Sequence, residues 1–232
     1  MHSPRSRVLP PSSSSREPSR SAVAAALGPD AERRLPINLP PDTPWLPLSR
    51  GPVPEPPTFW LGAYGELRPG VYERPLFQST GGPPRTVHMG LDLGAPAGTP
   101  VFAPCAGEVF LQGINPADGD YGGVLITRHQ RGEGLRMRAF YLLFGHLAHQ
   151  SVKLRAPGDP VAAGALLGWL GTERENGGWA PHLHLQVSEL APKTHDLPGA
   201  VTVTSFPTLR RRFPDPERFL RLSLPPHRAS SG

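Results

Sequence analysis

The chain has 232 residues, which is enough for one domain with tails, and a single cysteine, which excludes an internal disulfide. Its 32 Pro and 26 Gly favour short strands and many turns over long helices. No stretch approaches 18 apolar residues, so no membrane span is predicted. The apolar run at residues 22–27 is too short for the core of a signal peptide. Taken at face value, the protein is therefore expected to stay in the cytoplasm, with export by another route left open.

The net charge of +5 arises at the two ends of the chain. Residues 1–35 hold six Arg against three acids, and residues 205–232 hold six Arg against two. The three consecutive arginines at 210–212 are a candidate contact for an anionic polymer. No aromatic residues are interleaved with them to stack on bases, so nucleic-acid binding is not expected.

Composition divides the chain into four regions. Residues 1–35, rich in Pro, Ser and Arg, are predicted to be disordered. Residues 36–70 are Pro-rich but carry large apolar side chains, and they are predicted to pack on the core in an extended conformation. Residues 71–204 form the predicted main domain. Residues 205–232 form a basic C-terminal extension.

Short apolar segments bounded by turn residues predict a series of strands. They fall at about residues 86–93, 100–103, 107–112, 122–129, 136–144, 166–170 and 182–188. Turn-rich stretches between them are typical of an all-β domain with an antiparallel sheet. The continuous apolar run at 140–144 predicts a central strand that is buried on both faces.

The C-terminal extension contains one signal for a helix. Asp215 followed by Pro216 is a typical helix start, with the acid as N-cap and proline at the first helical position. A short helix is therefore predicted within residues 210–222.

Two histidine patterns indicate a metal site. The first is His88-Met-Gly-Leu-Asp92 and the second is His182-Leu-His184. Side chains alternate in a strand, so His88, Gly90 and Asp92 would share one face of a half-buried strand. By the same alternation His182, His184 and Gln186 would share a face, whereas on a helix residues two apart would not converge.

Histidine and carboxylate are the usual ligands of catalytic zinc, which takes three protein ligands and leaves one position for water. Without a metal, these groups would be half-buried and uncompensated, which is energetically costly. Gly90 would leave room for an ion between His88 and Asp92. The two patterns together therefore favour a metal site.

The order of the motifs resembles the lysostaphin-type zinc metallopeptidases, many of which cut peptide cross-bridges in bacterial peptidoglycan. The resemblance covers about residues 85–190. It includes an opening block at 88–101, a segment with a central histidine at 141–147 and a last block at 181–186. It implies an antiparallel sheet lining a groove that holds the metal.

Carried over residue by residue, the metal ligands of the family fall on His88, Asp92 and His184, and its catalytic histidines fall on His146 and His182. The resemblance thus implies a Zn²⁺ cofactor and hydrolysis of a peptide bond, with a peptide or peptidoglycan as substrate. His146 and His182 would divide the work of the base and of oxyanion stabilisation.

The resemblance also implies that residues 114–122 and 174–180 wall the groove as loops. Trp179 and Asn176, both in the second loop, are candidate substrate contacts. For Trp179 an equally open alternative is that it pins its loop to the core.

Two departures from the family pattern keep other functions open. Phe144 precedes Gly145-His146, where family members often have tyrosine. The turn before the last block reads Glu175-Asn-Gly-Gly-Trp-Ala-Pro181 instead of the Ser-Thr-Gly of many wall hydrolases. The alternatives are a cytosolic zinc hydrolase of a small peptide or amide, and a non-catalytic binding or activator module on the same fold.

Residues 36–60 carry a further hypothesis. A Pro-rich strand that lay across the groove would resist cleavage and could inhibit the enzyme. This hypothesis predicts that deleting residues 1–60 raises activity.

Overall fold

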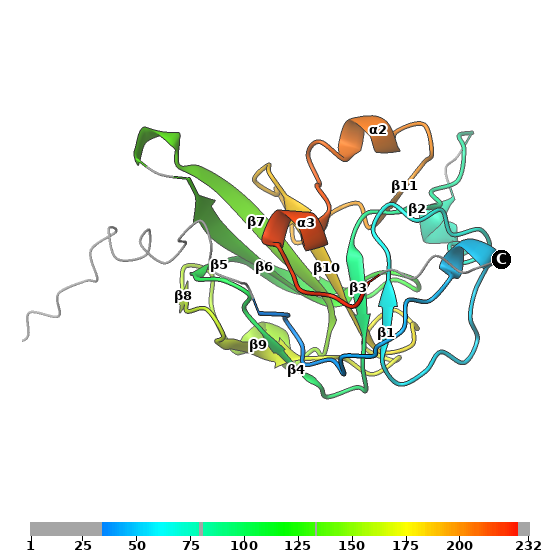
Figure 1. Ribbon diagram of the computed structural model, residues 1–232, viewed down its shortest axis with the longest axis horizontal. Coiled ribbons are helices and arrows are strands. Elements are labelled where there is room, and N and C mark those ends of the chain that lie inside the picture. Colours follow the sequence, from blue (N-terminus) through cyan, green and yellow to red (C-terminus); the bar gives the residue numbers. More distant parts are fainter. Residues whose placement is uncertain (1–33, 79–80, 133, 227–232) are drawn as a thin grey trace, which may run out of the picture.

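The computed structural model describes residues 34–78, 81–132 and 134–226 (Figure 1). Disorder is predicted for residues 1–35. Of these, residues 1–33 lie outside the described part of the chain. Among the described helices the longest has five residues, and none could cross a membrane.

A seven-stranded sheet in which every neighbouring pair is antiparallel forms the centre of the molecule (Figure 1). In spatial order its strands are β1 (Trp60–Gly62), β3 (Leu91–Gly94), β10 (His182–Ser188), β7 (Arg138–Leu147), β6 (Gly122–Arg131), β5 (Gly107–Asn115) and β8 (Pro160–Val161). Two small sheets pair β2 (Val87–His88) with β11 (Ala200–Val201) and β4 (Pro100–Phe102) with β9 (Leu166–Trp169). The predicted all-β, antiparallel class is confirmed.

In the part of the chain that the structure describes, helical structure is confined to short segments of three to five residues. The short α-helices are α2 (Phe206–Leu209) and α3 (Pro216–Leu220), and the 3₁₀ turns are η1 (Leu48–Arg50), η2 (Pro75–Phe77), η3 (Gly134–Arg136) and η4 (Ser151–Lys153). The predicted C-terminal helix is confirmed as α3. The Asp215 side chain accepts a hydrogen bond from the backbone N–H of Glu217 at 3.0 Å, as an N-cap does.

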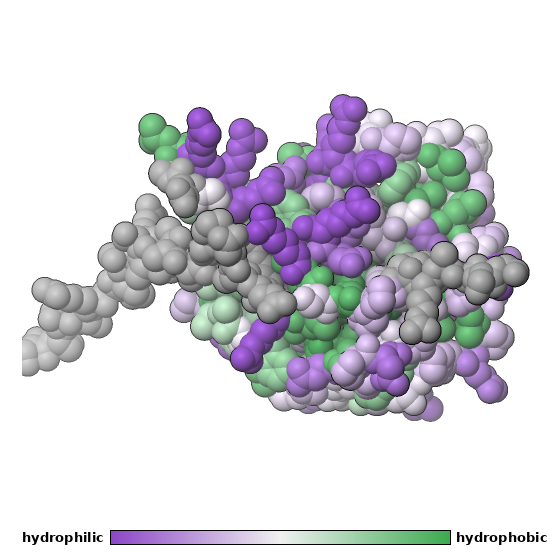
Figure 2. Space-filling view, in the orientation of Figure 1, coloured by the Kyte–Doolittle hydropathy of each residue, from purple (hydrophilic) through white to green (hydrophobic). Residues whose placement is uncertain are grey.

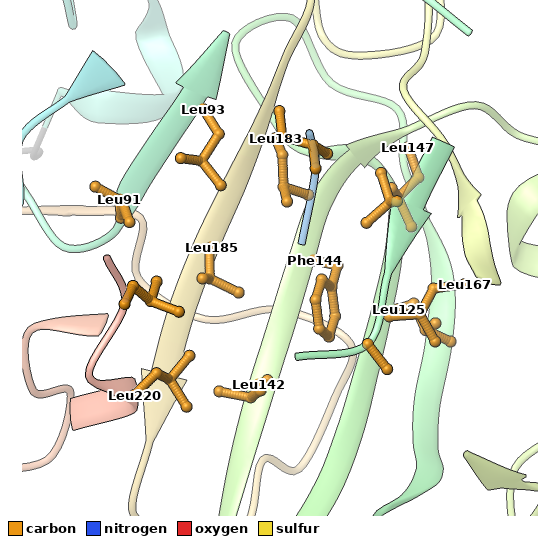
Figure 3. Packing of buried hydrophobic residues seen from close by; sticks show 14 of the residues in the cluster. Leu91, Leu93, Leu125, Leu142, Phe144, Leu147, Leu167, Leu183, Leu185 and Leu220 are labelled. Atoms are coloured by element: carbon orange, nitrogen blue, oxygen red, sulfur yellow. The ribbon is translucent and has the colours of Figure 1, made fainter. Parts of the chain in front are cut away.

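Two apolar clusters cover the two faces of the central sheet. In β7, Phe140, Leu142 and Phe144 enter one cluster, while Tyr141 and Leu143 enter the other. Figure 3 shows the first cluster, where leucines of the neighbouring strands β3 and β10 pack beside β7. The prediction of a strand buried on both faces at 140–144 is therefore confirmed, and β7 provides a rigid base for the residues at its end.

The predicted strand at 86–93 is wrong in one respect, because the chain divides it between two sheets. β2 pairs with β11, whereas β3 pairs with β1 and β10. The chain bends at Gly90, where a Cβ atom would lie only 2.3 Å from Cε1 of His184. The expectation of half-buried strands is also wrong, since every residue of β3 and β10 is buried.

Residues 34–62 belong to the fold and do not lie on it loosely. Ile37 is fully buried in the main core, and the carbonyl of Pro36 accepts a hydrogen bond from the backbone of Phe102 at 2.6 Å. Trp45 forms an isolated parallel β-bridge with Leu61, a residue of β1 in the central sheet. A deletion of residues 1–60 would remove these contacts, so we expect it to unfold the domain and not to activate it.

The C-terminal extension also packs on the domain. The carbonyl of Arg212 accepts a hydrogen bond from the backbone of Glu189 at 2.8 Å, and Glu189 forms an ion pair with Arg131 of β6. The guanidinium of Arg131 also lies 4.5 Å from the centre of the Phe219 ring. Figure 2 shows hydrophilic side chains gathered over the region of β6, β7 and α3.

If residues 34–62 are integral to the core, Ile37→Ala should destabilise the protein by about 2–5 kcal/mol, the usual loss for a buried Ile-to-Ala cavity. The free energy of unfolding would be measured by urea denaturation. Val203→Ala is the matched control, because Val203 is 58% exposed. A loss at Ile37 no larger than that of the control would contradict the packing described here.

Candidate metal centre

Three side chains converge beside the central sheet. Nε2 of His88, Nδ1 of His184 and Oδ1 of Asp92 lie 3.1 Å from one another in every pair. The sheet register explains the meeting, because His184 of β10 stands directly opposite Asp92 of β3. His88 reaches them from β2 through the bend at Gly90.

Each histidine uses its second ring nitrogen elsewhere. Nδ1 of His88 donates to the carbonyl of Ala63 at 2.9 Å, and Nε2 of His184 donates to Oε1 of Gln186 at 3.2 Å. A carbonyl oxygen can only accept, so the proton of His88 sits on Nδ1 and its Nε2 is an acceptor. Such outer hydrogen bonds orient histidines that bind metals.

Three acceptors therefore face one another with no proton between them, an arrangement that a cation would stabilise. Around a tetrahedral zinc with bonds of about 2.0–2.1 Å, neighbouring ligand atoms lie about 3.3 Å apart, close to the separation found here. His88, Asp92 and His184 are all buried, and their donor atoms fit a metal ion. The donor set of two imidazoles and one carboxylate is typical of catalytic zinc.

The other carboxylate oxygen of Asp92 is held by a buried arginine. Nη1 of Arg68 donates to Oδ2 of Asp92 at 2.8 Å and to the Tyr72 hydroxyl at 3.1 Å, while Nε pairs with Glu66 at 3.1 Å. Because Oδ2 of Asp92 is paired with Arg68, Oδ1 is the oxygen that faces the two histidines. Arg68 therefore sets which oxygen of Asp92 is available to a ligand.

The electrostatics of the site favour deprotonated donors. Burial lowers the pKa of His88 to about 4, and the nearby Arg68 acts in the same direction. Burial by itself would raise the pKa of Asp92, but its neighbours His88 and Arg68 outweigh burial, and the pKa lies well below its usual range. At neutral pH both groups are free of the proton that would compete with a cation.

Two further histidines face the same space. His146 and His182 have ring centroids 4.3 Å apart, and Nε2 of His182 lies 3.8 Å from Oδ1 of Asp92. Burial lowers the pKa of both, and for His146 the neighbouring His182 adds to the effect. Both are therefore neutral at pH 7, and the structure brings all five predicted histidine and aspartate residues into one site.

His146 reaches the site through a local irregularity of β7. Between Phe144 and Leu147 the strand advances three residues while its partner β6 advances two, from Leu125 to Gly123, which marks a β-bulge. His146 has a left-handed backbone with φ of 64°. Simple alternation would place its side chain on the core face with Phe144. The bulge instead turns it toward the cavity and the His182 ring.

These histidines line a cavity of about 490 Å³. Both loops predicted as walls contribute to it, with Gly119 and Tyr121 from one and Trp179 from the other. A third wall comes from the N-terminal segment, where Leu46, Leu48, Val53 and Trp60 line the cavity. This segment therefore forms a side of the cavity.

The two candidate substrate contacts lie in different positions. Trp179 lines the cavity, and it is also pinned, since its indole donates to the carbonyl of Gly119 at 3.1 Å and Arg74 lies 4.1 Å from its ring centre. Asn176 has 0% exposure and does not line the cavity. Its amide is instead hydrogen-bonded to the backbone of Trp179.

Sequence reasoning did not find the residues that support the ligands. The sequence places Gln186 on the same strand face as His182 and His184, but it assigns no supporting role to this residue. Arg68 carries no such signal, since it reaches the site from a segment without a motif. Tyr121 lies in the predicted wall loop 114–122, where nothing marks it as the residue whose hydroxyl donates to Oε1 of Gln186 at 3.2 Å.

Comparison with known proteins agrees with this site. Residues 86–196 match peptidase family M23. The chain carries an M23 peptidase domain. All five predicted site residues lie within the matched range, whereas Ala63 and Arg68, which orient His88 and Asp92, lie outside it.

The individual relatives each match a part of this chain. "DD-carboxypeptidase/endopeptidase Mpg" of Neisseria meningitidis and of Neisseria gonorrhoeae are each 33% identical over 100 residues, 43% of this chain and 20% of theirs. The chain thus spans about a fifth of the length of these relatives. Among solved structures, a putative M23 peptidase of Pseudomonas aeruginosa is 27% identical, with 57% of this chain and 43% of that chain covered and a TM-score of 0.37. The lysostaphin catalytic domain of Staphylococcus simulans is 20% identical, with 70% and 92% covered and a TM-score of 0.43.

The buried pair of Arg68 and Asp92 yields a stability prediction. Arg68→Met would leave the Asp92 carboxylate buried without its partner, so we expect a loss of about 3–5 kcal/mol in the free energy of unfolding. Urea denaturation in the presence of a chelator would measure it. Arg50→Met, at an exposed arginine of the same N-terminal segment, is the control. Equal stability of the two variants would contradict the assigned pair.

Proposed function

We propose that the protein is a zinc-dependent endopeptidase that hydrolyses a peptide bond in the cross-bridges or stem peptides of bacterial peptidoglycan. The observation that carries the proposal is the set of three buried acceptors, on His88, Asp92 and His184, at 3.1 Å from one another. The M23 family match supports peptidase chemistry, and the name of the Neisseria relatives supports a peptide substrate of this kind.

In this proposal His88, Asp92 and His184 hold the ion through Nε2, Oδ1 and Nδ1. When bound, zinc supplies Lewis-acid chemistry, because it polarises a peptide carbonyl and makes water more acidic. The protein must then provide a base for the water proton and a donor for the developing charge on the carbonyl oxygen.

His146 and His182 fit these two tasks. Nδ1 of each donates to a backbone carbonyl, of Asn176 at 2.9 Å and of Ala180 at 2.8 Å, which leaves Nε2 as an acceptor. A neutral imidazole with a free Nε2 can take the proton of the attacking water and later return it to the leaving amine. In its protonated form the same nitrogen can donate to the oxyanion.

A second candidate function is hydrolysis of a small peptide or amide by the same groups. The wall that Leu46, Leu48 and Trp60 add to the cavity favours it, because this wall narrows the access of a polymer to the histidines. Cleavage of small amides without clearing of peptidoglycan would select this function over the first.

The zinc ligands can be tested by elemental analysis of the purified protein. We expect about one zinc per chain in the wild type and loss of the metal in His184→Ala, because two remaining ligands hold zinc weakly. His195→Ala, a partly exposed histidine outside the ligand set, is the control and should retain it. A wild-type protein without stoichiometric metal, even after zinc is added, would overturn the proposal.

The catalytic role of His146 predicts a variant that separates binding from turnover. His146→Ala should retain zinc but clear purified peptidoglycan about 10²- to 10⁴-fold more slowly than the wild type, the usual contribution of a general base. Turbidity would follow the reaction, and a chelator should abolish the wild-type activity. Loss of zinc in the variant would make His146 a ligand, and an unchanged rate would remove it from catalysis.

A further inference from the structure

A single loop, residues 172–180, provides the hydrogen-bond acceptor for both non-ligand histidines. His146 comes from β7 and His182 from β10, yet their Nδ1 atoms donate to Asn176 and Ala180, four residues apart in that loop. The two carbonyls decide which nitrogen of each ring carries the proton. Any change in the shape of the loop would therefore alter both rings together.

The side chain of Asn176 fixes the distance between those carbonyls. Its Oδ1 accepts from the backbone N–H of Trp179 at 3.0 Å, and its Nδ2 donates to the carbonyl of Trp179 at 2.9 Å. These two hydrogen bonds join Asn176, whose carbonyl accepts from His146, to Trp179. Trp179 directly precedes Ala180, whose carbonyl accepts from His182. Asn176 is fully buried, so water cannot easily replace them.

The closed loop is anchored to the opposite wall of the cavity. The indole of Trp179 donates to the carbonyl of Gly119, and Arg74 donates to the carbonyl of Gly178 at 3.0 Å while pairing with Asp118 at 3.1 Å. The loop therefore has an outer support. Backbone hydrogen bonds and the Glu175 carboxylate link its first half, and the amide of Asn176 is the side-chain link between residues 176 and 179.

We infer that Asn176 is a positioning residue that holds His146 and His182 in one tautomer, with the proton on Nδ1 and the lone pair of Nε2 facing the cavity. It acts through the loop and touches neither substrate nor metal. The inference replaces the substrate contact expected for Asn176. Its consequence for turnover rests on the proposed function, but its consequence for the tautomers does not.

The test is NMR of ¹⁵N-labelled histidine side chains in the full-length, zinc-loaded protein. Long-range ¹H–¹⁵N correlations distinguish the two tautomers, and His146→Ala and His182→Ala assign the signals. We expect the Nδ1–H pattern for both residues in the wild type. Asn176→Ala should shift both toward a mixture of tautomers, with kcat lowered tenfold or more, KM within about twofold and zinc content unchanged.

Ser151→Ala is the matched control. Ser151 is buried, and its hydroxyl bonds to the backbone N–H and carbonyl of Trp169 at 2.9 and 3.2 Å, the same kind of link in a place that does not line the cavity. Its removal should leave the histidine tautomers unchanged. If Asn176→Ala does not fold, Asn176→Ser, which can keep the acceptor for Trp179, serves in its place and should shift the tautomers in the same direction.

Pure Nδ1–H tautomers at both histidines in a folded Asn176 variant would overturn the inference, and so would equal effects of the Asn176 and Ser151 changes. A protein that binds no zinc or cleaves no peptide bond would instead defeat the proposed function, and the tautomer measurement would still decide the role of Asn176.

Discussion

The structure depends on one electrostatic constraint, the meeting of three acceptor atoms at 3.1 Å inside a buried site. Lone pairs at this separation repel one another unless a cation lies between them, so the surrounding residues must hold them there. Ala63 and Gln186 bind the outer nitrogens of the two ligand histidines, and Arg68 binds the outer oxygen of Asp92. Each of these hydrogen bonds opposes rotation of the ring or carboxylate that would turn its metal-facing atom away.

Some residues of the site lie inside the range that matches the M23 family, and others lie outside it. The ligands and the two other histidines lie within the matched residues 86–196, as does Gln186. Ala63, Arg68 and the apolar wall from Leu46 to Trp60 lie outside it. The segments that flank the matched residues therefore complete the site.

The loop at 172–180 orients the two histidines that are not candidate metal ligands. The candidate metal ligands His88, Asp92 and His184 are oriented by several separate segments, whereas His146 and His182 both donate to carbonyls of one loop. The carbonyls of one loop therefore set the orientation of both rings. Such an arrangement would suit the two catalytic roles proposed for His146 and His182.

The sequence by itself predicted most of the longer strands and the antiparallel class from local alternation, and it predicted the five histidine and aspartate residues from the order of the motifs. Because side chains alternate along a strand, His182, His184 and Gln186 are expected on one face of β10, and the structure has them there. Only the tertiary structure decided the rest. His146 violates strand alternation, since a bulge and a left-handed φ of 64° turn it from the core to the cavity. Arg68 and the carbonyls that orient the histidines belong to irregular segments, whose positions depend on contacts between distant residues and leave no periodic trace in the sequence.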